Sequence, residues 1–151
     1  MNNRSKSTQL FVERKNKMME RFLANKFRVR IIGILFSPKA RKILIGKNKG
    51  DNDLSFLEGE LKYNEELDVC LKRVAREKTG YKVHNLGAVY AENMLKDKDE
   101  LRLYFLCEAT EGKEAPGPNV KELKWVSPKK IEGFIKQKLP TRLRGYIFNL
   151  G

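Results

Sequence analysis

The segment from residue 59 to residue 81 constrains the fold of this chain more than any other part of the sequence. It begins with a polar loop from Gly59, continues into a helical pattern from about Glu65 to Thr79, and stops at Gly80. Glycine suits the left-handed conformation that ends many helices. Apolar residues recur at helical spacing along one side of the pattern, at Leu67, Cys70, Leu71 and Val74. We therefore expect a loop–helix–loop unit whose helix buries one face.

Size and composition indicate one domain. The chain has 151 residues, of which 40% are hydrophobic and 34% charged, as in globular proteins. No apolar run approaches the roughly 20 residues that span a bilayer, so we expect no transmembrane segment and a cytoplasmic location. Cys70 and Cys107 lie in apolar segments and predict two reduced core cysteines. The single histidine, His84, excludes a multi-histidine metal site.

The net charge is +13 and the pI is about 9.8. Such a charge attracts anionic partners, which include nucleotides, RNA, DNA and acidic membrane surfaces. The lysines are spread along the chain, so the alternative is that the charge serves only solubility.

The remaining pattern predicts a mixed α/β domain over residues 28–151, preceded by a basic helical extension, residues 1–27, packed on it. Helix 8–25 carries an apolar face at Phe11, Met18, Met19, Phe22 and Leu23. We expect a hairpin of strands 28–36 and 42–45, and further strands at 82–91, 101–109 and 122–126. Ser127 and Pro128 open a helix, and a terminal helix follows at 141–150.

Residues 59–81 resemble the Nudix box, Gly-x5-Glu-x7-Arg-Glu-U-x-Glu-Glu-x-Gly-U, in which U is a bulky apolar residue. Six residues stand on the expected places and Ala75 is a small occupant of another: Gly59, Glu65, Arg73, Glu77, Gly80 and Tyr81. Val74 and Lys78 stand where the family has glutamates. The later strand 122–126, with Trp125, also matches the family layout, so the resemblance covers about residues 28–138. It implies a Nudix-like (MutT-like) α/β/α sandwich with a mixed β-sheet.

The resemblance also implies a pyrophosphatase site that holds Mg²⁺ or Mn²⁺. In Nudix hydrolases the glutamates at positions 74, 77 and 78 and the carbonyl before Gly59 serve the ion. Here Glu77 and the Glu58 carbonyl would bind the metal. Glu77, Arg73 and Glu65 would be the catalytic set, with Glu65 and Arg73 as the salt bridge that ties the loop to the helix. Gly59, Lys78 and Arg76 would bind the ligand.

Val74 and Lys78 weaken that site. An ammonium about 4 Å from a dication is repelled by roughly 8 kcal/mol at an effective dielectric near 20. Valine neither ligates metal nor accepts a proton, and loss of a general base costs about 10²- to 10⁴-fold in rate. Four other carboxylates are candidates to replace the missing ones: Glu58, Glu60, Glu114 and Glu122.

Three functions follow as alternatives. The first is a divergent Nudix hydrolase of low activity that acts on a nucleoside diphosphate-linked compound. The second is a non-catalytic module that binds a nucleotide or RNA, with Lys78 on the phosphate. The third is a subunit of a ribonucleoprotein assembly, anchored by the basic N-terminal helix. A homodimer would fit any of them.

Overall fold

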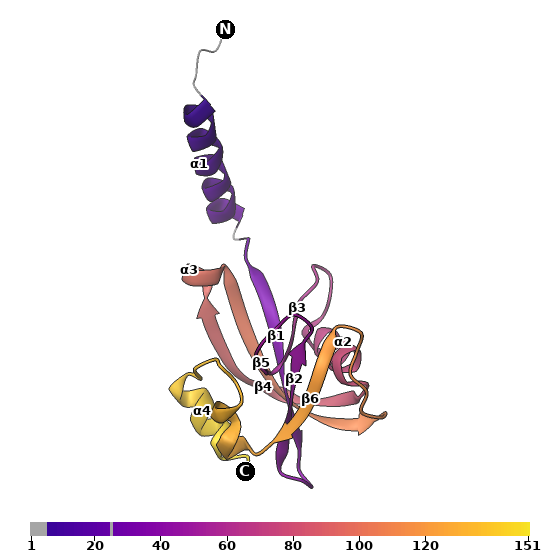
Figure 1. The fold of residues 1–151 in the computed structure, drawn as a ribbon. Coiled ribbons are helices and arrows are strands. Elements are labelled where there is room, and N and C mark those ends of the chain that lie inside the picture. The colour runs from indigo at the N-terminus through magenta and orange to yellow at the C-terminus, as the bar shows by residue number, and fades with distance from the viewer. Residues whose placement is uncertain (1–5, 25) are drawn as a thin grey trace.

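The computed structural model describes residues 6–24 and 26–151, with side chains at residues 6–15 and from residue 26 onward. A six-stranded sheet runs in the order β4-β5-β1-β2-β6, and β3 pairs with β1 (Figure 1). Among the strands of the described chain, β1 and β5 pair in parallel and the other pairs are antiparallel. The strands are β1 (Arg28–Ser37), β2 (Lys42–Asn48), β3 (Leu57–Glu60), β4 (Lys82–Met94), β5 (Glu100–Glu111) and β6 (Val120–Val126).

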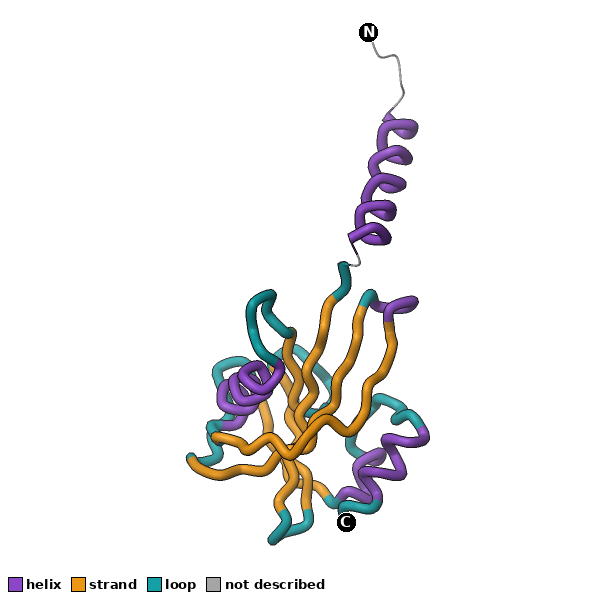
Figure 2. Tube along the Cα trace, turned by 180° about the vertical axis from the view of Figure 1, so that it is seen from behind, coloured by secondary structure: helices purple, strands orange, loops and turns teal. Residues whose placement is uncertain are grey.

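Helices cover the sheet on both faces, because side chains alternate along each strand. Ile31 and Leu35 of β1 pack in a core with helix α2 (Leu67–Thr79). Ile32 and Ile34 pack in a second core with the 3-10 helix η1 (Pro128–Gly133) and helix α4 (Thr141–Phe148). Figure 2 shows α2 and α4 on opposite sides of the strands. The predicted α/β/α sandwich with a mixed sheet is confirmed.

Helix α2 ends as the sequence predicts, at Gly80, whose φ is 80°. It begins two residues later than expected, at Leu67. The loop after β5 covers its end, where the Ala115 N–H donates to the Thr79 carbonyl (2.9 Å) and the Gly117 N–H to the Lys78 carbonyl (3.2 Å). These bonds satisfy carbonyls that a helix leaves without internal partners.

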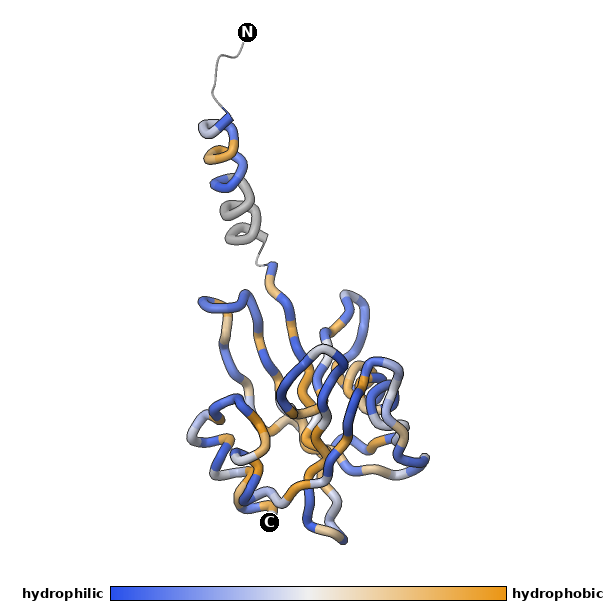
Figure 3. The backbone as a smooth tube through the Cα atoms, in the orientation of Figure 1, coloured by the Kyte–Doolittle hydropathy of each residue, from blue (hydrophilic) through white to orange (hydrophobic). Residues whose placement is uncertain are grey.

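Two short elements were not expected from the sequence. Strand β3 pairs with β1 through residues 57–60, just before the helix loop. A one-turn helix, α3 (Leu95–Lys98), lies in the charged segment where we expected a loop, because Asn93 Oδ1 accepts the Leu95 N–H (2.9 Å) and Asp99 adopts a left-handed φ of 53°. Figure 3 shows this turn as hydrophilic, and hydrophobic residues along the strands between α2 and α4.

The N-terminal helix α1 (Lys6–Ala24) extends beyond the start of β1, away from the sheet (Figure 1). Leu10 and Phe11 are 47% and 68% exposed. Met18, Met19, Phe22 and Leu23 lie outside the described side chains. Packing of this helix on the domain therefore stays a prediction.

Two smaller expectations concern the cysteines and the membrane. Cys70 and Cys107 are free and buried, as expected. No helix in the described part of the chain is long and apolar enough to cross a bilayer.

Candidate functional site

A bidentate ion pair ties the loop before α2 to the helix. Arg73 Nε lies 2.7 Å from Glu65 Oε2, and Arg73 Nη2 lies 2.9 Å from Glu65 Oε1. Arg73 Nη2 also donates to the Glu60 carbonyl (3.0 Å), and Glu65 Oε1 accepts the Lys62 N–H (3.1 Å). The Arg73 guanidinium holds the pKa of the Glu65 carboxyl at about 2. Both predicted residues thus meet, and the contacts they make fix the loop.

Gly59 and Val74 are in close contact across the same junction. Gly59 lies in strand β3 and not, as expected, in the loop, and a Cβ built on it would lie 2.5 Å from Val74 Cγ2, so the strand needs glycine here to approach the helix. Val74 is only 2% exposed and packs with Cys70, Leu71 and Ala75. The first position where the family has a glutamate therefore belongs to the core under α2.

Glu77 points to solvent. Its side chain is 62% exposed and pairs with Arg73 Nη1 at 3.5 Å. The Glu77 carbonyl oxygen faces Gly117, and a Cβ at Gly117 would overlap it. The carboxylate is free to approach a ligand from solvent, and the loop after β5 fixes the backbone beneath it.

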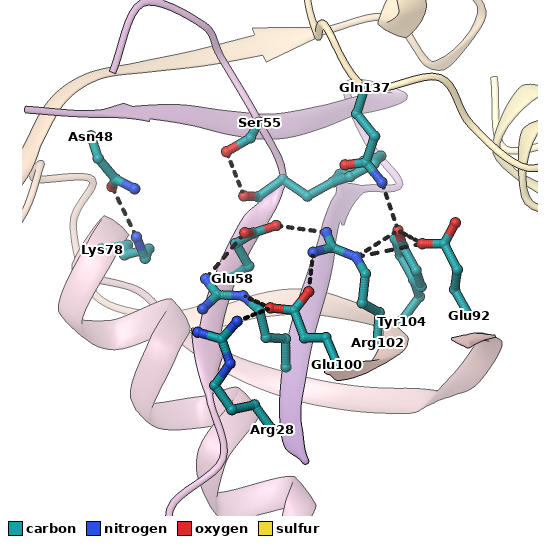
Figure 4. A network of polar contacts seen from close by, with 12 residues as sticks. Arg28, Asn48, Ser55, Glu58, Lys78, Glu92, Glu100, Arg102, Tyr104 and Gln137 are labelled. Atoms are coloured by element: carbon teal, nitrogen blue, oxygen red, sulfur yellow. Dashed lines mark hydrogen bonds and ion pairs between the residues drawn. The ribbon is translucent and has the colours of Figure 1, made fainter. Parts of the chain in front are cut away.

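Lys78 turns toward the sheet. Its Nζ donates to Asn48 Oδ1 at 2.9 Å (Figure 4). Burial lowers the pKa of Lys78, while the charge of Glu58 acts in the opposite direction. With Glu77, Pro118, Asn119 and Val120, Lys78 lines a cleft of about 390 Å³ at the end of α2. Lys78 also lines a narrow pocket beside this cleft, and Asn48, which accepts from its ammonium, lines the same pocket.

The Glu58 side chain is held on the sheet by two arginines. Its Oε1 lies 3.1 Å from Arg30 Nη2 and its Oε2 lies 2.9 Å from Arg102 Nη2. Arg102 also pairs with Glu100 at 3.3 Å and Glu92 at 3.5 Å (Figure 4). Sequence reasoning did not single out Arg30 or Arg102. The available signal was a charged residue inside an otherwise apolar strand.

Arg76 lies apart from Lys78. It is exposed and lines a groove of about 510 Å³ between α2 and β4, together with Val69, Lys72 and Val83. The structure therefore does not bring Arg76 into the Lys78 cleft.

The candidate replacement carboxylates do not gather around Glu77. Glu114 Oε1 accepts from Trp125 Nε1 (2.6 Å), and Glu122 pairs with Lys47 (3.7 Å). Among the described side chains, at residues 6–15 and 26–151, no group of three or more His, Cys, Asp or Glu is placed to hold a metal ion. Mg²⁺ prefers about six oxygen ligands, usually including one or two carboxylates. Val74 lies in the core and position 78 carries a lysine, so Glu77 is the one carboxylate that the three box-helix positions keep for a divalent ion.

Comparisons with known proteins agree with this fold. The NUDIX domain family model matches residues 26–148. A NUDIX hydrolase from Nitrosomonas europaea superposes with a TM-score of 0.70 at 16% identity, covering 81% of this chain and 70% of its own. An ADP-ribose pyrophosphatase from Streptococcus suis gives 0.62 at 16% identity, over 83% and 89% of the two chains.

A third structure, MutT studied from Aliivibrio salmonicida and Vibrio cholerae, superposes with a TM-score of 0.67 at 16% identity, over 81% and 96% of the two chains. No curated protein matches this sequence. Because the family model spans most of the chain, this protein belongs to the NUDIX domain family.

Proposed function

We propose that this Nudix domain binds a nucleoside diphosphate derivative without a divalent ion and hydrolyses it slowly or not at all. The observation that carries the proposal is the position of Lys78. Lys78, at the position of the family's last box glutamate, lines the cleft at the end of α2, and its ammonium bonds to Asn48 Oδ1 in the adjoining narrow pocket. A lysine at this position binds a phosphate through the positive charge of its ammonium group, as a bound metal cation would.

Two further observations support an anionic ligand. The chain carries a net charge of +13, which attracts anions over a distance. The neighbouring structures include an ADP-ribose pyrophosphatase and a UDP-X diphosphatase, whose ligands contain a diphosphate. RNA binding, a homodimer and a cytoplasmic location stay predictions.

Binding measured by calorimetry tests this proposal. Wild-type protein should bind ADP-ribose or ADP equally well in chelator and in Mg²⁺, and more weakly as salt rises. Lys78→Gln should weaken binding by about tenfold or more, because a charge-assisted contact to phosphate is lost. Lys72→Gln is the matched control, since Lys72 lies on the same helix but pairs with Asp68 at 2.8 Å.

Binding that needs Mg²⁺, or that Lys78→Gln leaves unchanged, would contradict the proposal. Equal losses for the two lysine variants would show that only net charge matters.

The second candidate function is slow hydrolysis. The exposed Glu77 carboxylate and the intact Glu65–Arg73 pair favour it. Mg²⁺ or Mn²⁺ would then be needed, with ADP-ribose, dinucleoside polyphosphates and nucleoside triphosphates as the substrates to assay. Glu77→Gln should abolish any metal-dependent release of product. A rate that this substitution leaves unchanged would remove Glu77 from the mechanism.

A further inference from the structure

Two arginines stand side by side on the sheet. Arg30 of β1 and Arg102 of β5 are paired directly in the parallel register. The Arg102 side chain is 7% exposed and that of Arg30 is 25% exposed. Like charges on neighbouring strands repel each other, and burial strengthens the effect. An anion between the two guanidinium groups is needed to offset the repulsion.

Glu58 and Glu100 both lie against the two arginines, and Glu58 is the more exposed of these carboxylates, at 21% against 6%. Each Glu58 carboxylate oxygen accepts from a different arginine, Oε1 from Arg30 Nη2 and Oε2 from Arg102 Nη2. Figure 4 shows the contact between Glu58 and Arg102. The carboxylate therefore bridges two guanidinium groups in the way that two oxygens of one phosphate group do. Its side chain is 21% exposed, so solvent reaches this position.

The arginine pair has an unused hydrogen-bond donor. Arg30 Nε is buried and makes no hydrogen bond, although Glu100 Oε1 lies 3.9 Å away. A phosphate offers more acceptor oxygens than a carboxylate and carries more charge. It is therefore the better match for the donors assembled here.

Lys78 lies against the start of β3, the strand that carries Glu58. It lines a narrow pocket with Ser55, Phe56 and Leu57, the residues that lead directly to Glu58. The charges of Glu58 and Arg30 both act on the Lys78 ammonium. Arg30 of β1 and Arg102 of β5 thus contact the Glu58 carboxylate, and Lys78 of α2 lines the pocket next to it, with its Nζ bonded to Asn48.

We propose that Arg30, Arg102 and Lys78 form a phosphate-binding site, which the Glu58 carboxylate occupies in the free protein. A phosphate group of the ligand binds by displacing Glu58 from the two arginines. The identity of the ligand as a diphosphate derivative rests on the proposed function above. Because a phosphate must replace two charge-assisted hydrogen bonds, Glu58 lowers the affinity for any anion and favours doubly charged groups over carboxylates.

Inorganic pyrophosphate, titrated by calorimetry in the presence of chelator, tests this site. Glu58→Gln should bind pyrophosphate at least about tenfold more tightly than wild type, because the competing charge is removed. Pyrophosphate should also raise the melting temperature of Glu58→Gln more than that of wild type. Glu111→Gln is the matched control: it changes the net charge equally, at a side chain that is 71% exposed on β5. It should stay within about twofold of wild type.

Glu58→Asp covers the case in which Glu58→Gln does not fold. The shorter side chain keeps the charge but withdraws it from the arginines, so pyrophosphate should again bind more tightly than in wild type. Folding of each variant is checked by circular dichroism. Affinity that is equal to or weaker than wild type in the folded variants would overturn the proposal and leave the network with a purely structural role.

The two proposals fail in different ways. Lys78-dependent binding of ADP-ribose by wild type, with no gain in Glu58→Gln, would retain the proposed function and overturn the role of Glu58. Tight pyrophosphate binding by Glu58→Gln, with no ADP-ribose binding by wild type, would retain the role of Glu58 and overturn the proposed function. Absence of both would overturn both.

Discussion

The loop that precedes α2 and the end of α2 have kept different parts of the Nudix pattern. Before α2, Glu65 of the loop forms its bidentate pair with Arg73 of the helix, and Gly59 of β3 lies against the same helix. At the helix end, Lys78 bonds to Asn48, and no cluster of ligands for a metal forms among the described residues. The loop contacts satisfy buried groups whether or not an ion binds. The retained loop contacts therefore show that the local fold is kept, whereas the residues at the end of α2 determine which ligand the site can bind.

Among the substitutions that test this comparison, Val74→Glu has the largest expected effect on stability. Val74 is 2% exposed, so the new carboxylate would be buried without a partner and should lower the free energy of unfolding by about 3–5 kcal/mol. Urea denaturation measures the loss. Val74→Ala, which only deletes methyl groups, is the control and should cost roughly 1–3 kcal/mol. A Val74→Glu protein as stable as wild type that gained Mg²⁺ binding would show that this position still reaches an ion.

Gly59→Ala tests the close contact between strand β3 and helix α2. The added methyl would meet Val74 Cγ2, and we expect a loss of about 1–3 kcal/mol in unfolding free energy. The double variant Gly59→Ala/Val74→Ala should be more stable than the sum of the single losses predicts, because the smaller side chain at 74 leaves room. Strict additivity in the same urea experiments would mean that the two residues do not compete for space.

The smallest expected effect is the pH dependence that Glu65 contributes. Its pKa is about 2 in the folded protein, against an ordinary value of 4.5. Because the pKa is lower in the folded state than in the unfolded state, Glu65 stabilises the fold at pH values above its pKa in the unfolded chain. This contribution is lost as the pH falls toward the pKa in the folded protein. The difference in unfolding free energy between wild type and Glu65→Gln should therefore be constant above about pH 5 and shrink toward about pH 2. A difference that does not vary over this range would show that the Arg73 pair does not favour the charged form.

Local patterns in the sequence were sufficient for most of the fold. Alternation and helical spacing located the strands, α2 and its end at Gly80, because each signal depends on neighbours a few residues apart. Strand β3 was missed because four residues interrupted by a glycine, Leu57–Glu60, carry little alternation. It forms because β1 offers a partner, which is a tertiary contact.

The site was predictable only where the motif is contiguous. Glu65 and Arg73 are eight residues apart, and their pairing follows from the box. The Glu58 contacts join residues 28 and 44 positions away, to Arg30 and Arg102. Those contacts depend on the register between β1, β3 and β5, which no local pattern specifies. Sequence reasoning therefore named Glu58 for its carbonyl and as a replacement carboxylate, and did not foresee that its side chain pairs with two arginines.

The buried position of Val74 has a consequence for how this chain can evolve. A glutamate introduced at position 74, where the family has its first box glutamate, would enter the core that α2 buries. Domains have only about 5–15 kcal/mol of stability to lose, so such a variant is close to unfolding. Substitution toward the family's metal site therefore passes through a less stable protein, whereas substitutions that improve anion binding avoid that loss of stability.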